Sequence, residues 1–429
     1  MNRSAAGFNV IGYLGAAMGL GVSVRMLVQV LREAGHDVVG LDIDGLAGVQ
    51  RARVAHDIPL VSSVEQLPFR HNIMCAAVQT LPAFLLRRLS GLLAPRFRNA
   101  AYVFWELPAI PRALRPALAL FDATLAGSQF TKQAIETSVS GSRSFLMTHA
   151  LPRDLYIAAR SDVRRRFGLP EDAYLFCASF DLFSGVQRKN PEALIEAFTR
   201  AFPPQQRDAH LVLKCNGDPA LARASPLMRR LLQRVIDDGR VHLIIETLDY
   251  ADVMGLYGAC DAYLSFHRAE GLGLGAMEAM WLGLPVIATG YSGNMDFMNA
   301  RNSILLPYRL VSTAGAEWHY SPAFCGRAAQ WADVDVAEAA QAMRRLHDDA
   351  NLGRLLGARA RRDIAELQDV AWTAPWLPQL QRALDERDGG ARRAIDTLRL
   401  RSAEWLDPVL LRLNAQAAMS RVMRRVRPS

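Results

Sequence analysis

Cysteine is scarce in this sequence, and its spacing suggests neither disulfides nor a structural zinc site. The 429 residues contain five cysteines without paired spacing, Cys75, Cys177, Cys215, Cys260 and Cys325. This pattern favours a reducing cytosol. No run of about 18 uncharged apolar residues is present, which argues against a membrane-spanning helix. The first residues run into a strand pattern without a cleavage region, so we expect no signal peptide and a cytoplasmic protein.

Acidic residues are absent between Glu65 and Glu106, where five arginines occur, Arg70, Arg87, Arg88, Arg96 and Arg98. Within this stretch, LPAFLLRRLSGLL (81–93) is apolar on one side and basic on the other. Such a helix either lies on an anionic membrane surface, here the inner face of the cytoplasmic membrane, or packs on a sheet. The basic segment 391–429 allows the same two interpretations. No recognised nucleic-acid-binding module accompanies the arginines, so we expect no nucleic-acid partner.

The rest of the composition is that of a globular protein, with 51% hydrophobic and 21% charged residues and a net charge of +8. Strand-like and helix-like segments alternate in two series, one from residue 8 and one from residue 173. We therefore predict an α/β protein of two doubly wound, Rossmann-like domains that face a central cleft. The predicted domains are 1–160 and 161–370, followed by a crossover helix and a basic helical tail over 371–429.

The first series opens with a buried strand over 8–13, a turn that holds Gly15, Gly19 and Gly21, a helix over 23–35 and a strand over 36–44. The three glycines are wrongly spaced for the G-x-G-x-x-G dinucleotide fingerprint, which argues against a nicotinamide oxidoreductase. A serine or threonine at the start of 128–138 predicts a capped helix there.

The most informative stretch is 270–289, EGLGLGAMEAMWLGLPVIAT. A strand pattern precedes it, three glycines open it, a helix follows, and Gly283 and Pro285 end that helix before the next strand. A glycine loop at a helix N-terminus presents backbone N–H groups that suit phosphate. The carboxylates of Glu270 and Glu278 can accept hydrogen bonds from adjacent sugar hydroxyls. Together these features favour a nucleotide-sugar site.

This stretch resembles the E-x7-E signature of retaining GT-B glycosyltransferases, especially glycosyltransferase family four (group 1), and the similarity continues through 288–298. The resemblance implies the GT-B fold and transfer of a hexose from a GDP- or UDP-linked donor. The implied acceptor is a glycan or a lipid-linked glycan in polysaccharide biosynthesis, and mannose is the sugar we expect. No D-x-D metal motif follows a strand near this site, so we expect no metal and no cofactor.

The resemblance assigns Glu278 to the ribose hydroxyls of the donor and Glu270 to the hydroxyls of the transferred sugar. Arg188 and Lys189, in a segment similar to F-D-x-x-S-x-x-x-R-K-N-P, are expected to face the diphosphate and to be catalytic because they neutralise the leaving group. Further donor contacts are expected from the backbone at Leu272, Gly273, Leu274, Gly293 and Asn294, and from Gly19 and Gly21 in the first domain.

Three departures from the family pattern stand out. Many relatives carry His-Asp where this chain has Trp105 and Glu106, so Glu106 is the expected acceptor-binding or sugar-orienting group. Asp296 occupies the position of a family glutamate. An additional arginine, which many relatives have shortly before the lysine, is missing from 181–184, and Arg188 is expected to supply that charge.

Each assignment has a structural alternative. Glu278 would be a solvent-facing helix residue, Glu270 a helix-start acid, and Arg188 with Lys189 two surface cations. Gly19 and Gly21 would only form a turn, and Trp105 would only pack in the core. At the level of function, the alternatives are a sugar-nucleotide epimerase or phosphorylase on the same scaffold, since fold does not fix function, and a non-catalytic nucleotide-sugar-binding protein.

Overall fold

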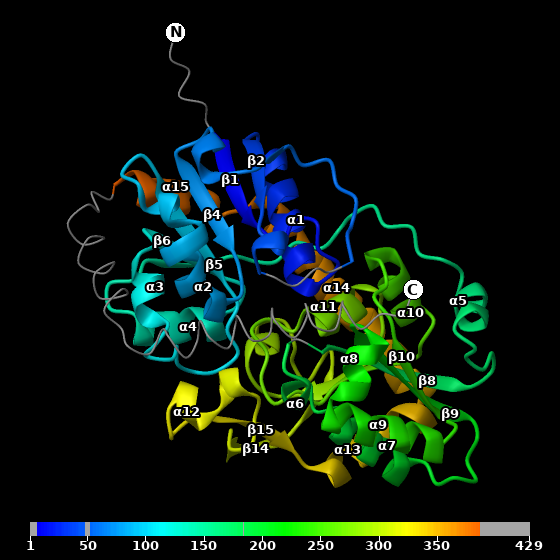
Figure 1. Ribbon diagram of the computed structural model, residues 1–429. Coiled ribbons are helices and arrows are strands. Elements are labelled where there is room, and N and C mark those ends of the chain that lie inside the picture. The colour runs from blue at the N-terminus through cyan, green and yellow to red at the C-terminus, as the bar shows by residue number, and fades with distance from the viewer. Residues whose placement is uncertain (1–6, 48–51, 183, 387–429) are drawn as a thin grey trace, which may run out of the picture. The chain divides into compact units, whose positions relative to one another are not determined.

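The computed structural model describes residues 7–47, 52–182 and 184–386. The chain divides into two compact units (Figure 1). Unit 1 consists of Met1–Ala150 and Val370–Ser429, and unit 2 of Leu151–Asp369. The predicted basic segment 391–429 lies outside the described residues, as does 387–390 of the predicted last segment.

Unit 1 is built on a seven-stranded parallel sheet in the order β3-β2-β1-β4-β5-β6-β7. The strands are β1 (Gly7–Gly12), β2 (Asp37–Asp42), β3 (Leu60–Val61), β4 (His71–Cys75), β5 (Arg98–Val103), β6 (Ala123–Ala126) and β7 (Ser144–Leu146). The longer helices are α1 (Gly19–Glu33), α4 (Gln129–Ser138) and α15 (Leu377–Asp385), and the shorter ones are α2 (Leu81–Ala83), α3 (Arg115–Ala119), the π-helical η4 (Phe84–Arg88) and the 3-10 turns η1 (Asp44–Ala47), η2 (Val64–Gln66), η3 (Val78–Thr80) and η5 (Ser90–Leu93). The predicted doubly wound parallel sheet is confirmed.

Helix α1 begins four residues earlier than the sequence pattern predicted, so Gly19 and Gly21 lie in its first turn and not in the preceding loop. A Cβ added to Gly21 would lie 2.2 Å from the carbonyl oxygen of Ala16. Glycine at 21 thus lets the first helical turn approach the loop after β1 closely. Gly19 has open space around it, so nothing in unit 1 requires a glycine there.

The segment with an apolar and a basic side, 81–93, does not form one regular helix but α2, η4 and η5 in succession. Its apolar side chains Leu81, Phe84, Leu85, Leu89 and Leu92 are buried in unit 1. Arg87 and Arg88 are exposed. Of the two interpretations of this segment, packing inside the protein therefore applies to its apolar face. Only its basic face remains at the surface.

The end of the described chain packs into unit 1. Trp372, Trp376, Leu377 and Leu380 share a buried cluster with Phe8 of β1 and with other core residues of the first sheet. Helix α4 has the predicted cap, because Ser128 accepts a hydrogen bond from the backbone N–H of Thr131.

Unit 2 is built on a six-stranded parallel sheet in the order β10-β9-β8-β11-β12-β13, with a separate antiparallel hairpin, β14-β15. The strands are β8 (Tyr174–Asp181), β9 (Ala209–Asn216), β10 (Val241–Ile245), β11 (Ala262–Ser265), β12 (Val286–Thr289), β13 (Ile304–Leu306), β14 (Tyr308–Ser312) and β15 (Gln330–Val334). Its helices are α5 (Arg160–Arg166), α6 (Val186–Lys189), α7 (Pro191–Ala201), α8 (Pro219–Ala224), α9 (Pro226–Asp237), α10 (Tyr250–Gly258), α11 (Leu274–Trp281), α12 (Pro322–Cys325), α13 (Val336–Asp348) and α14 (Ala350–Thr373), with turns η6 (Gly293–Asp296) and η7 (Trp318–Tyr320).

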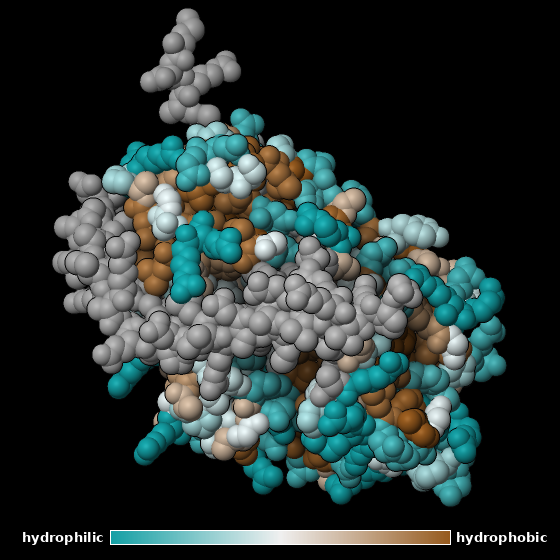
Figure 2. Space-filling model, in the orientation of Figure 1, coloured by the Kyte–Doolittle hydropathy of each residue, from teal (hydrophilic) through white to brown (hydrophobic). Residues whose placement is uncertain are grey.

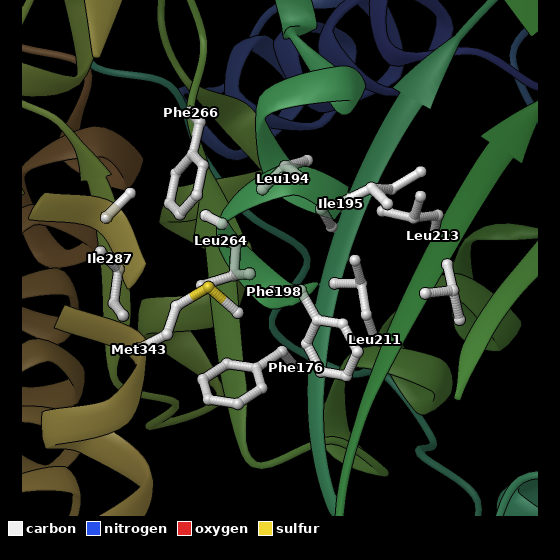
Figure 3. Packing of buried hydrophobic residues seen from close by; sticks show 14 of the residues in the cluster. Phe176, Leu194, Ile195, Phe198, Leu211, Leu213, Leu264, Phe266, Ile287 and Met343 are labelled. Carbon is white, nitrogen blue, oxygen red and sulfur yellow. The ribbon is translucent and has the colours of Figure 1, made fainter. Parts of the chain in front are cut away.

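One face of the second sheet packs on α7 and α13. Figure 3 shows Phe198 and Ile195 of α7 and Met343 of α13 against inward side chains of β8, β9, β11 and β12. Alternate residues along each strand, such as Leu211 and Leu213, point to this core, as a strand period of two requires. The residues between them therefore point to the other face.

The strand order of the second sheet reverses between β8 and its neighbour β11. Ligands of open α/β sheets bind at such a switch point, beyond the carboxyl ends of the strands. The loop after β8 leads to α6, and the loop after β11 leads to α11. The topology therefore brings the predicted cations and the predicted glycine loop to the same edge of one sheet.

The surface is of mixed character. On the face drawn in Figure 2, hydrophilic residues alternate with smaller hydrophobic areas. Within the part of the chain that the structure covers, no helix combines the length and the apolar character needed to cross a bilayer.

The core of unit 2 gives a matched test of packing. Ile195 is 1% exposed, whereas Ile236 on α9 is 76% exposed. We expect Ile195→Ala to lower the free energy of unfolding by about 2 to 5 kcal/mol. Ile236→Ala should change it by less than about 0.5 kcal/mol. Chemical denaturation of both variants measures the difference, and equal effects would contradict the described core.

Candidate functional site

The glycine loop after β11 forms the expected helix start. Gly273 has a φ of 89°, which favours glycine, and it directly precedes α11. No side chain caps this helix. The Ala276 amide donates to the Gly273 carbonyl, and the amides of Leu274 and Gly275 precede this first helical hydrogen bond. Together with the helix dipole, these two amides suit an anion. Leu272 is buried and Leu274 is half-buried, so in both the backbone is the better candidate for a donor contact.

The loop after β12 packs against the glycine loop and forms a hydrogen bond with its first residue. The amide of Gly293 donates to the carbonyl of Glu270 over 2.9 Å. A Cβ added to Gly293 would lie 2.4 Å from the carbonyl oxygen of Gly271, so only glycine fits. The Gly293 amide is used by this hydrogen bond in the protein, and its predicted donor contact stays a prediction. Gly293 fixes the position of the glycine loop.

Ser292 also holds the start of the glycine loop. Its φ of 76° lies in the left-handed region, which is uncommon for serine. Its hydroxyl accepts a hydrogen bond from the Glu270 amide over 2.8 Å and donates to the Tyr291 carbonyl. Strained backbone of this kind is often found at functional sites, because the surroundings have to impose it.

The Glu270 carboxylate is buried between two cations. Its Oε1 contacts Nζ of Lys189 closely and lies 3.1 Å from Nη1 of Arg188. Burial by itself raises the pKa of Glu270, but the charges of Lys189, Arg188 and His267 outweigh burial and hold the pKa at about 2. Glu270 is therefore an anion at every physiological pH, and the ion pair links the loops after β8 and β11.

Arg188 and Lys189 have different surroundings. The Arg188 guanidinium donates to the carbonyl of Ser184 through Nε and Nη2, and to the carbonyl of Ala269 through Nη1. The Arg188 side chain is 4% exposed, whereas that of Lys189 is 23% exposed. The guanidinium of Arg188 thus binds protein carbonyls, and the ammonium of Lys189 is the more exposed of the two cations. That both cations face the donor stays a prediction.

A segment that the sequence reasoning did not single out packs on Arg188. The Tyr320 ring lies 5.9 Å from the guanidinium carbon, and a carboxylate oxygen of Glu317 accepts from the Gln187 amide over 3.0 Å. Arg268 donates to the Gln187 carbonyl and pairs with Asp333. Glu317, Tyr320 and Asp333 follow β14 or lie on β15, more than 120 residues beyond α6, and no local pattern pointed to them.

Glu278 is 4% exposed on α11, which excludes the solvent-facing alternative. Burial raises its pKa to about 8, although the Tyr250 hydroxyl and the charges of Lys214 and Lys189 act in the opposite direction. A buried acid that faces a lysine and a tyrosine hydroxyl is suited to bind polar groups of a ligand. Lys214 of β9 was also missed by the sequence reasoning.

Asn294 is fully buried, and its side chain is used inside the protein. Nδ2 donates to the Thr289 carbonyl over 3.0 Å, and Oδ1 lies 3.1 Å from Nε2 of buried His267. The same His267 nitrogen reaches the Tyr291 carbonyl, so Nε2 carries the proton. Asn294 thus ties β12 to the residues after β11, and only its backbone remains for the predicted donor contact. Asp296, the predicted substitute for a glutamate, is exposed.

The structure therefore gathers one set of predicted residues in unit 2: Arg188, Lys189, Glu270, Leu272, Gly273, Leu274, Glu278, Gly293 and Asn294. Gly19, Gly21 and Glu106 belong to unit 1. Trp105 is buried there, and its indole N–H donates to the Ala109 carbonyl, which agrees with its alternative as a core residue. Glu106 is half-buried, and its expected role in binding the acceptor or orienting the sugar during catalysis stays a prediction.

No group of three or more histidine, cysteine or acidic side chains is arranged to hold a metal ion in residues 7–47, 52–182 and 184–386. Metal independence stays a prediction. The ammonium of Lys189 and the first-turn amides of α11 supply positive potential at the glycine loop by themselves.

The two parallel sheets with their helices define the GT-B fold of glycosyltransferases. Residues 174–316, a third of the chain, match the family model described as Glycosyl transferases group 1. This match covers the cations, the glycine loop and both glutamates. Fold and family match together support a GT-B glycosyltransferase. No curated protein matched the sequence.

Three solved structures illustrate the similarity of fold. Anabaena Alr3699/HepE in complex with UDP and glucose has a TM-score of 0.63 at 17% identity, over 88% of this chain and 100% of that one. Sucrose-phosphate synthase from Thermosynechococcus elongatus has a TM-score of 0.63 at 17% identity, over 88% of this chain and 98% of that one. WaaG, a glycosyltransferase involved in lipopolysaccharide biosynthesis, has a TM-score of 0.56 at 15% identity, over 89% of this chain and 100% of that one.

The raised pKa of Glu278 predicts a pH-dependent effect on stability. The folded protein retains this proton up to about pH 8, whereas the unfolded chain loses it near 4.5. The wild type is therefore destabilised progressively as the pH rises from 4.5 to 8, by about 1.4 kcal/mol for each unit of pKa difference. Glu278→Gln should remove this loss, so its melting temperature should exceed that of the wild type at pH 8 and equal it near pH 4.5.

The control for this prediction is Glu196→Gln, because Glu196 is an exposed glutamate paired with Arg234. An exposed pair contributes about 0 to 1 kcal/mol, so this variant should follow the wild type at each pH. Thermal melts between pH 4.5 and 8.5 measure all three proteins. A difference between Glu278→Gln and wild type that does not change with pH would show that Glu278 is not the buried acid described here.

Proposed function

We propose that the protein is a retaining glycosyltransferase that moves a hexose from a nucleotide sugar to a glycan or lipid-linked acceptor in polysaccharide biosynthesis. The observation that carries this proposal is the arrangement at the switch point of unit 2. There an uncapped helix start, a half-buried lysine and two buried glutamates share one sheet edge. A nucleotide sugar matches these groups, because its anionic diphosphate lies between two sugars that carry hydroxyls, the ribose and the hexose.

In the proposed reaction, the amides at the start of α11 and the Lys189 ammonium bind the diphosphate. The bond from the acceptor oxygen to the anomeric carbon forms on the face from which the diphosphate leaves. The bond from that carbon to the phosphate oxygen breaks, and the acceptor proton passes to the leaving diphosphate. Positive charge placed where negative charge develops lowers the barrier, and one such contact is commonly worth about 3 to 4 kcal/mol.

The state of Glu270 supports a proton transfer to the diphosphate. A carboxylate with a pKa of about 2 is a weak base and carries no proton to donate at neutral pH. We therefore assign Glu270 to hydroxyls of the transferred sugar and to holding Lys189 in place. Glu278, deeper in α11, is assigned to the ribose hydroxyls.

For the donor, our proposal is GDP-mannose, with UDP-hexoses as the first comparison. HepE was solved with UDP-glucose and with UDP and glucose, which places UDP donors among related folds. The proposed peripheral contact with an anionic membrane would rest on exposed basic side chains such as Arg87 and Arg88, because the apolar face of 81–93 is buried.

A panel of nucleotide sugars tests the reaction. Purified protein is incubated with GDP-mannose, UDP-glucose, UDP-galactose and UDP-N-acetylglucosamine, with and without glycan acceptors, and release of nucleoside diphosphate is measured. A glycosyltransferase releases diphosphate faster when acceptor is present, and the new bond keeps the anomeric configuration of the donor. An epimerase would convert the sugar without release, and a non-catalytic binder would bind a nucleotide sugar without turnover.

Two substitutions separate transfer from donor binding. Lys189→Met should lower kcat by about 100-fold or more, because it removes charge stabilisation of the leaving group. Glu278→Ala should mainly weaken donor binding, by about 10-fold or more, because it removes the hydrogen bonds between the buried acid and the ribose hydroxyls and leaves those hydroxyls unpaired. Steady-state kinetics and nucleotide titration measure both effects. Lys132→Met, at a surface lysine of unit 1, is the control, and parameters equal to wild type in both site variants would overturn the assignment.

A further inference from the structure

Lys214 is a buried lysine that the proposed reaction does not use. It lies near the carboxyl end of β9 and is 6% exposed. Within the part of the chain that the structure describes, no hydrogen bond or ion pair involves its ammonium group. Buried lysines are rare unless they are paired, since moving a charge out of water is costly. A lysine in such a place is suited to bind a polar group of a ligand.

The face on which Lys214 lies follows from the sheet register. Its neighbours Leu213 and Cys215 belong to the core on the side of α7 and α13, so Lys214 points to the opposite side. Its partner across the ladder is Ser179 of β8. The Ser179 hydroxyl lies 2.5 Å from the Tyr257 hydroxyl of α10 and 3.0 Å from the Tyr263 hydroxyl of β11.

This polar group of side chains lies directly beneath the glycine loop. A Cβ added to Gly275, in the first turn of α11, would lie 2.3 Å from the Tyr263 hydroxyl and 3.4 Å from that of Ser179. Glu278 is three residues further along the same helix. Lys214 therefore belongs to the polar face that continues from the start of α11 toward Glu278.

The charges around Lys214 indicate what kind of ligand it binds. Burial lowers its pKa, while the nearby acids Asp181, Glu278 and Glu246 favour its charged form to the extent that they are ionised. None of these acids forms an ion pair with it among the residues described. Three acids in the vicinity disfavour a second phosphate site here, whereas Lys189 and the amides of α11 already provide one. A neutral group that is rich in carbonyl or hydroxyl oxygens fits better.

Composition points in the same direction. Only three of the 50 basic residues are lysines, Lys132, Lys189 and Lys214, and two of them lie around the glycine loop. An ammonium is a compact donor of three hydrogen bonds, whereas a guanidinium needs a wider space. A lysine at 214 suits a confined position beside Glu278.

We propose that Lys214 binds the nucleoside half of the donor, donating from Nζ to a base carbonyl or a ribose oxygen. The inference rests on the proposed function, because it needs a nucleotide in unit 2. It adds a cation to the nucleoside contacts, next to the acid Glu278.

The test uses the whole chain and titration calorimetry with UDP, GDP, uridine, guanosine and inorganic pyrophosphate. The variants are then compared with whichever of UDP and GDP the wild type binds more tightly, and with the corresponding nucleoside. Lys214→Met should weaken that nucleotide and its nucleoside by about 10- to 100-fold, as expected for a lost hydrogen bond from a charged group. Pyrophosphate binding should be unchanged. Lys132→Met, the same substitution at the remaining lysine, should bind like wild type.

A second pair of variants separates direct contact from an effect through Glu278. If Lys214 only favoured the ionised form of Glu278, Lys214→Met would have no effect in the Glu278→Gln background. Direct contact predicts that the loss persists there. Thermal melts verify folding, and Lys214→Gln, which keeps a donor without charge, should give an intermediate loss and replaces Lys214→Met if that variant does not fold.

The outcomes are distinct. Wild-type protein that binds neither nucleotide overturns the proposed function together with this inference. Wild-type protein that binds a nucleotide, with Lys214→Met binding it equally well, overturns the inference alone. If Lys214→Met weakened pyrophosphate binding equally, Lys214 would be a phosphate contact. If Lys214→Met weakened nucleotide binding only when Glu278 is present, and not in the Glu278→Gln background, Lys214 would be a positioning residue. Either result contradicts the proposal.

Discussion

The site in unit 2 depends on the ion pairs of Glu270 with Lys189 and Arg188. Two loops of a parallel sheet leave neighbouring strands, β8 and β11, and nothing in the ladder fixes how their tips meet. The buried carboxylate of Glu270 fixes them, because each cation belongs to the first loop and the anion to the second. Without these cations, burial would raise the pKa of Glu270, and a neutral acid would not form the ion pairs that join the two loops.

Several less common backbone features serve this arrangement. Asn190, directly after Lys189, has a φ of 56°, and Ser292, whose hydroxyl accepts from the Glu270 amide, has a φ of 76°. Gly293 fits only because it has no side chain. Arg188 is used up by carbonyls and by Glu270, which leaves Lys189 as the cation that can respond to a ligand. The site thus combines a rigid base with one adaptable charge, as preorganised electrostatic sites require.

Much of this could be predicted from the sequence where the signal is local. Strand and helix periods gave both sheets, and the glycines with Pro285 located α11. The start of α1 was misplaced, because the need for glycine at 21 comes from the Ala16 carbonyl and not from a turn. The contacts of Arg188 and Gly293 inside the protein could not be predicted for a related reason: their partners, Ala269 and Glu270, lie 81 and 23 residues away in sequence. Tyr320 and Lys214 were missed because only tertiary contacts reveal them.

A double-mutant cycle on Glu270 and Lys189 tests the central claim most directly. Glu270→Gln leaves two cations at a buried site without their anion, which should cost about 3 kcal/mol in the free energy of unfolding at pH 7. Adding Lys189→Met removes one of these cations, so the double variant should be more stable than Glu270→Gln alone, with a coupling of at least about 1 kcal/mol. If the changes in the free energy of unfolding caused by the two substitutions were simply additive, Glu270 and Lys189 would not form the ion pair proposed for them.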